Sequence, residues 1–145
     1  MLLNILLFHN ILFTLVPPLS VALNGPTTEV ANGSTTQLTC TASSSNPAVT
    51  LTWKHNRAVF ANTWSYSYVA GSNYGTVTSQ TLVITPTRNM NGDTFSCSAN
   101  NSATTATVDS NVITLDVRCK LVKMKILNFP IGELNVLFIR NCCLY

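Results

Sequence analysis

Hydrophobic and polar residues alternate along several short segments of this chain. Leu38, Cys40 and Ala42 alternate with Thr39 and Thr41, and a period of two places successive side chains on opposite faces of a β-strand. The same period gives one apolar face to each of four later segments: Val49, Leu51 and Trp53; Leu82 and Ile84; Phe95, Cys97 and Ala99; Ile113, Leu115 and Val117. The pattern predicts short strands that each turn one face inward.

Turn-forming residues separate these segments, and no segment shows a convincing helical period. Asn and Gly stand together at positions 32–33 and 91–92, Ser-Asn-Pro at 45–47 and Gly-Ser-Asn at 71–73, all combinations that favour turns. Short strands at this spacing predict an all-β fold, an antiparallel β-sandwich or barrel.

Composition narrows the class of protein. Of the 145 residues, 46% are hydrophobic and only 9% are charged, a balance typical of an extracellular β-protein. Positions 21–117 hold three cations against four anions, whereas positions 118–145 hold five cations against one anion. The expected folded part is therefore not basic, and it lacks the electrostatic footprint of a nucleic-acid-binding protein.

Two cysteines and a tryptophan identify the fold more closely. Cys40, Trp53 and Cys97 all fall on inward faces, within "LTCTAS", "LTWKHN" and "NGDTFSCSANN", with "LVITPT" between the last two. Over about residues 20–117 this arrangement resembles the immunoglobulin superfamily, specifically the constant-2 or intermediate sets of nephrin-like adhesion receptors. The resemblance implies an immunoglobulin-like sandwich of about seven strands across residues 21–117.

The same resemblance assigns roles to individual residues. It implies an inter-sheet disulfide between Cys40 and Cys97, with Trp53 packed on the bridge and Leu82 and Phe95 in the core. Phe95 stands where the family usually has a tyrosine, so the hydrogen bond of the tyrosine corner cannot form at this position.

The two ends of the chain differ from the middle. Residues 1–22 are interpreted as a signal peptide cleaved after Ala22 or as a non-native leader, and the stretch around Pro17 also resembles an interdomain linker. Residues 118–145 are interpreted as an irregular hydrophobic and basic tail or as a truncation artefact, and their charges make them a poor membrane span. The state of Cys119, Cys142 and Cys143 stays open, because an odd number of cysteines cannot all pair within one chain.

Candidate surface sites come from two kinds of motif. Asn32 and Asn100 begin N-glycosylation sequons, although an unmodified turn asparagine is the simpler alternative. Trp64, Tyr66 and Tyr68 alternate along one segment. The favoured interpretation is a strand that turns its rings toward the core; the alternative is an aromatic contact with a partner.

No catalytic or metal-binding constellation is found in the sequence. His55 is the one histidine outside the leader, and neither a metal site nor a catalytic triad can be assembled around it. We expect no enzyme activity, cofactor or small-molecule substrate.

The resemblance implies a non-enzymatic, extracellular protein-binding module for cell adhesion or cell-surface recognition. Its partner would be another immunoglobulin-like cell-surface domain, and any membrane attachment would depend on parts absent from this chain. Two alternatives remain: a structural spacer from a longer tandem receptor, and a secreted single-domain immune or decoy factor.

Overall fold

The alternating segments form strands throughout the part of the chain that the structure describes. This structure is a computed structural model, and it describes residues 15–60, 65–104 and 107–119. Its elements are β1 (Val21–Asn24), β2 (Val30–Ala31), β3 (Thr36–Ser45), β4 (Thr50–His55), β5 (Ala58–Val59), β6 (Ser65–Ala70), β7 (Thr76–Ile84), the 3-10 turn η1 (Arg88–Met90), β8 (Thr94–Asn100), β9 (Thr107–Asp109), β10 (Ile113–Thr114) and β11 (Val117–Arg118).

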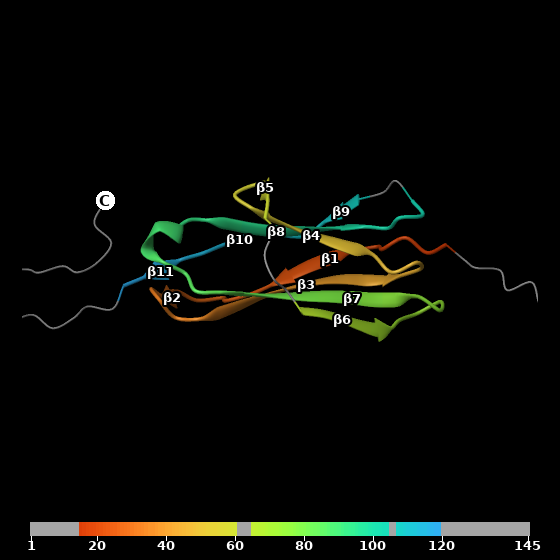
Figure 1. Cartoon of the computed structure of the whole chain (residues 1–145), viewed down its shortest axis with the longest axis horizontal. Helices are drawn as coiled ribbons and strands as arrows, with labels where there is room; N and C mark the ends of the chain where they lie inside the picture. Colours follow the sequence, from red (N-terminus) through yellow and green to blue (C-terminus); the bar gives the residue numbers. More distant parts are fainter. Residues whose placement is uncertain (1–14, 61–64, 105–106, 120–145) are drawn as a thin grey trace, which may run out of the picture.

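Two sheets lie one above the other (Figure 1). The first has the order β1-β3-β7-β6, and the second has the order β10-β8-β4-β5 with β9 also paired to β8. All pairs within these sheets are antiparallel, whereas β2 and β11 form a separate parallel pair. The all-β antiparallel sandwich is therefore confirmed.

The described residues hold eleven strands instead of the seven expected, because two expected strands are divided and the two-residue β5 is added. The first is divided between β1, on one sheet, and β2, which pairs with β11. The last is divided into β9, β10 and β11 along residues 107–118. Short turns account for the tight connections: Asn56 and Arg57 both have positive φ, 49° and 69°, as a two-residue hairpin turn requires.

The inward rows predicted from the alternation cross the sheets in register. In the first sheet Leu23 lies beside Cys40, Cys40 beside Gln80, and Gln80 beside Tyr66. The first three of these side chains are buried. The core lies between the sheets and includes Leu38, Leu51, Trp53, Leu82, Phe95, Ala99 and Leu115.

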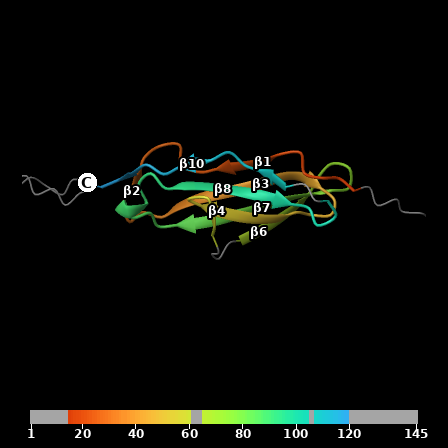
Figure 2. The ribbon, with the colours of Figure 1, turned by 90° about the horizontal axis from the view of Figure 1, so that it is seen from above.

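The described chain enters and leaves the sandwich at opposite ends of its long axis. The red segment before β1 enters at one end of the long axis, and β11 leaves at the other (Figures 1 and 2). Val21 and Ala22, the last residues of the expected leader, form the first half of β1 and pair with Ala42 and Thr41. Residues 1–14 and the tail from 120 onward lie outside the described residues.

Candidate functional site

A disulfide joins the two sheets through the centre of the sandwich. Cys40 of β3 and Cys97 of β8 are bonded, with their Cα atoms 6.4 Å apart, so the expected inter-sheet disulfide is confirmed. Trp53 lies directly across from Cys97 in the β4–β8 pairing and is completely buried. Its indole Nε1 donates a hydrogen bond of 2.9 Å to Oε1 of Gln80 on β7. This polar link crosses from sheet to sheet beside the disulfide.

Phe95 lies in the core, and polar side chains of the β4–β5 hairpin and of the residue before β8 surround its position. The ring is 1% exposed and stacks on the imidazole of His55, with 4.6 Å between the ring centroids. His55 Nε2 lies 2.7 Å from a carboxylate oxygen of Asp93, and Asn56 donates to the other oxygen at 2.8 Å. Burial raises the pKa of Asp93, but the hydrogen bonds from Asn56 and His55 and the charge of His55 outweigh it, so this pKa lies below its usual value.

Sequence reasoning missed this His55–Asp93–Asn56 network. A signal was present: Asp93 precedes Phe95 by two and His55 follows Trp53 by two, so strand parity places them near one face. The antiparallel register that puts His55 across from Phe95 could not be derived from either segment alone. The network joins the β4–β5 turn to the start of β8. Phe95 lies in this region and has no hydroxyl with which to form a hydrogen bond of its own.

Tyr66 and Tyr68 lie on the core-facing side of β6 but are not buried. They lie across from Gln80 and Thr78 of β7, both completely buried, and residues opposite one another in a sheet point the same way. Nevertheless Tyr66 is 48% and Tyr68 58% exposed. The facing sheet ends beside β4 with the two-residue β5, whose own side chains are exposed. The rings thus lie at the open flank of the sandwich instead of filling the core.

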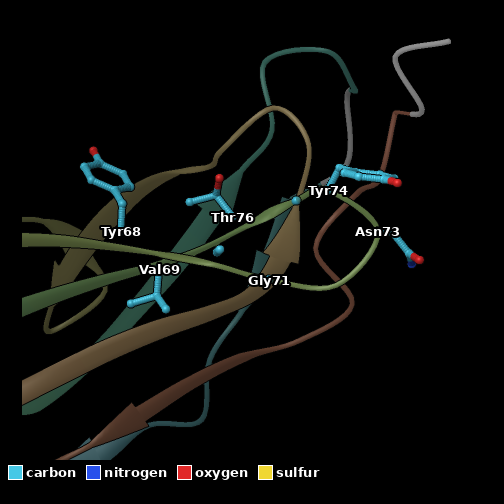
Figure 3. Close-up of a pocket in the computed structure, with 8 residues that line it drawn as sticks. Tyr68, Val69, Gly71, Asn73, Tyr74 and Thr76 are labelled. Carbon is cyan, nitrogen blue, oxygen red and sulfur yellow. The ribbon is translucent and has the colours of Figure 1, made fainter. Parts of the chain in front are cut away.

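Two further apolar side chains are exposed on the hairpin that carries the two tyrosine rings, one of them on its other face. The rings stack with centroids 5.9 Å apart, and Val69, on the opposite face of the strand, is 60% exposed. Figure 3 shows Tyr68 and Val69 pointing to opposite sides of β6, with Tyr74 at the turn that follows. Tyr74 is 98% exposed and has a positive φ of 58°. We call Tyr66, Tyr68, Val69 and Tyr74 the aromatic hairpin surface; Trp64 lies outside the described residues.

A hollow of about 760 Å³ lies along the same hairpin, between the end of β6 and the start of β7. It is open to solvent, and its lining includes Gly71 and Gly75 as well as the larger side chains Tyr68 and Tyr74. Ser44 of β3 lies directly under both glycines and donates a hydrogen bond of 2.8 Å to the carbonyl of Ser72. This hydrogen bond therefore fixes the tip of the hairpin to β3.

The two sequon asparagines are both exposed. Asn32 follows β2 in a turn, where its side-chain oxygen accepts a hydrogen bond of 2.9 Å from the backbone N–H of Arg88. Asn100 is the last residue of β8. Modification of these two asparagines stays a prediction.

Neither a metal-binding cluster nor a membrane-spanning helix is present among residues 15–60, 65–104 and 107–119. No group of three or more His, Cys, Asp or Glu side chains there is arranged to hold a metal ion. In the same residues, no helix is both long enough and apolar enough to cross a bilayer.

The strand order corresponds to a known pair of sheets. The first sheet matches the A-B-E-D order of an immunoglobulin constant-type domain, and the second matches G-F-C with a short added strand. The solved ectodomain of mouse nectin-like molecule 4 (Ig1–Ig3) is similar, with a TM-score of 0.58 and 21% identity over 72% of this chain and 35% of that one. The solved Rst D1-D2 is also similar, with a TM-score of 0.60 and 21% identity over 71% of this chain and 50% of that one.

Three further comparisons complete the assignment. The C1 domain of the IgNAR antibody has a TM-score of 0.54 and 23% identity, and the match covers 68% of this chain and 95% of that domain. The matched part of this chain therefore corresponds in length to one antibody domain, whereas it spans half or less of the nectin-like ectodomain and of Rst D1-D2. No curated protein sequence matches it. A family model described as an immunoglobulin domain matches residues 17–101, more than half of the sequence, and the chain belongs to that immunoglobulin domain family.

Proposed function

We propose that this domain is a non-enzymatic, extracellular recognition module that binds another protein, itself an immunoglobulin-like cell-surface domain. The observation that carries the proposal is the aromatic hairpin surface. Tyr66, Tyr68, Val69 and Tyr74 are each between 48% and 98% exposed on one hairpin. Tyrosines are favoured anchors of protein interfaces, because they supply a large contact area at low cost in conformational entropy.

The anchors are also held in place before any partner binds. The register of β6 with β7 is regular over all six residues of β6, and Ser44 fixes the turn beyond it. A surface that is already ordered loses less conformational entropy on binding. The hairpin is therefore suited to contact a partner without rearrangement.

An extracellular location is supported by the disulfide, because such bonds persist in oxidising compartments. The similar fold of a nectin-like ectodomain supports a place at the cell surface. The finer assignment to a constant-2 or intermediate set, as in nephrin-like receptors, is part of this proposal. So are glycans at Asn32 and Asn100.

A spacer in a tandem receptor is the second candidate. It is favoured by the opposite positions of the segment before β1 and of β11 on the long axis (Figure 1). Domains joined in series need such an arrangement. A spacer role, however, does not explain why tyrosines are exposed at the edge of the sandwich.

The two candidates differ in their response to truncation of the tyrosines. We would secrete the full chain from cultured cells, couple it to beads, and measure binding to a panel of immunoglobulin-like receptor ectodomains and to a second copy of the chain. The variant Tyr68→Ser with Tyr74→Ser should lose at least tenfold in affinity. The control is Val83→Ser, an exposed apolar residue of β7 outside the hairpin surface. Equal binding by both variants, or no binding by the wild type, would reject the recognition role.

A further inference from the structure

The outer edge of β6 differs from the other sheet edges in the described residues. It has six residues, whereas the other edge strands β1, β5, β9 and β10 have four, two, three and two. β6 pairs with β7 on one side, and no described strand pairs with the other side. Alternate backbone N–H and C=O groups of such an edge point away from the sheet and can pair with another strand.

The opposite edge of the same sheet is closed by a side chain. Asn111 accepts a hydrogen bond from the N–H of Leu23 at 2.9 Å and donates one to its carbonyl at 3.0 Å. The amide of Asn111 thus occupies the backbone groups of β1 that a strand from another molecule would need. No such clamp onto β6 is seen within residues 15–60, 65–104 and 107–119.

The usual protection of an exposed edge is also missing from β6. Proteins commonly guard an edge with a lysine, a proline or a bulge. β6 contains neither a charged residue nor a proline, and its register with β7 is unbroken. Over positions 58–87 the sequence has no Asp, Glu, Lys, Arg or His. Two copies of this edge can approach each other without like-charge repulsion, which costs stability when like charges face across strands.

The sequence of β6 suits pairing with itself. In an antiparallel pair related by a two-fold axis at Ser67, Tyr66 of one copy lies across from Tyr68 of the other, and Tyr68 across from Tyr66. Ser65 then lies across from Val69. Aromatic pairs across neighbouring strands are among the stabilising ones. All four tyrosines would share one face, continuing the stack that Tyr66 and Tyr68 already form at 5.9 Å.

We propose that the occupant of this edge is a second copy of the chain, bound β6 to β6 in antiparallel register around Ser67. Together the two first sheets form one continuous sheet, and the interface is isologous, as expected for a two-fold dimer. This inference rests on the proposed recognition function and specifies its partner: the contact is homophilic and uses the backbone edge as well as the tyrosines.

The test measures the mass of the full chain by sedimentation equilibrium over a range of concentrations, after alkylation of accessible thiols to exclude intermolecular disulfides. The wild type should approach twice the monomer mass. Ser67→Lys places two ammonium groups across the axis and should lower the association constant at least tenfold. Val83→Lys, on the exposed face of β7, should leave it within twofold.

Charge pairing then tests whether the partner is a second copy in this register. A mixture of Ser67→Lys and Ser67→Glu should recover a dimer that neither variant forms alone. A monomeric wild type, a dimeric Ser67→Lys, equal losses in Ser67→Lys and Val83→Lys, or no recovery in the mixture would each overturn the proposal.

A measurement on the unaltered protein covers the case in which a variant fails to fold. Hydrogen exchange in residues 65–70 of the wild type should slow as its concentration rises; no slowing would overturn the proposal. If the chain stays monomeric while its hairpin still captures a receptor ectodomain, this inference fails and the proposed function stands. If neither contact is detected, both fail.

Discussion

Removing the bridge by the double change Cys40→Ala with Cys97→Ala is expected to destabilise the domain severely. The bridged cysteines are 57 residues apart, and in the chain-entropy model closing such a loop restricts the unfolded chain by about 4 kcal/mol. Each substitution also deletes one buried heavy atom beside Trp53, at about 0.5–1.5 kcal/mol each. The expected loss of about 5–7 kcal/mol compares with a total stability of about 5–15 kcal/mol for a typical domain.

Urea unfolding followed by circular dichroism measures this loss. The m-value should rise as well, because the unfolded variant chain is no longer cross-linked and exposes more surface. The control is Thr41→Ala with Ser79→Ala, which removes a hydroxyl pair 3.0 Å apart between β3 and β7 of the first sheet. Replacing both partners of such a bond is nearly neutral. A loss from the cysteine variant no larger than that of the control, with an unchanged m-value, would refute the reasoning.

Three further changes test the packing and the polar network. Trp53→Phe removes the donor to the buried Oε1 of Gln80 and should cost about 2–4 kcal/mol in urea unfolding; a cost under about 1 kcal/mol would contradict a structural role for this bond. Because the folded pKa of Asp93 is lowered, its contribution is present above the usual aspartate pKa of about 3.9 and is lost as pH falls through the folded value. The melting temperature of Asp93→Asn should therefore lie below that of the wild type at pH 6, and the gap should narrow as pH falls below about 3.9; a gap independent of pH would exclude the carboxylate as its source. A Cβ at Gly71 would collide with the side chain of Ser44, so Gly71→Ala should cost about 1–3 kcal/mol. Adding Ser44→Gly should recover part of that cost, and strictly additive losses would show that the two residues do not interact.

Much of the interior could be predicted from the sequence because the period of a strand is local. Alternation places Leu38, Cys40, Trp53, Leu82 and Phe95 on inward faces, and in the structure each is at most 1% exposed. The parity of a side chain depends only on its neighbours in the same segment. For the same reason, alternation alone is enough to place the rings at positions 66 and 68 on one face of their strand.

The place of a strand within its sheet cannot be predicted from the sequence of that strand alone. Strand order makes β6 an edge, and the brevity of β5 leaves the flank beside the tyrosines uncovered. Likewise, the register of β4 with β8 brings His55 near Asp93 and across from Phe95.

The sequence by itself determined the fold class, the faces of the strands and the inward position of the two cysteines and of Trp53. Only the tertiary structure decided which of the inward-facing side chains are covered, which strand edge is left open, and which polar groups meet around Phe95. Each of these depends on pairing between segments distant in the chain, and a two-residue period within one segment carries no information about its partner.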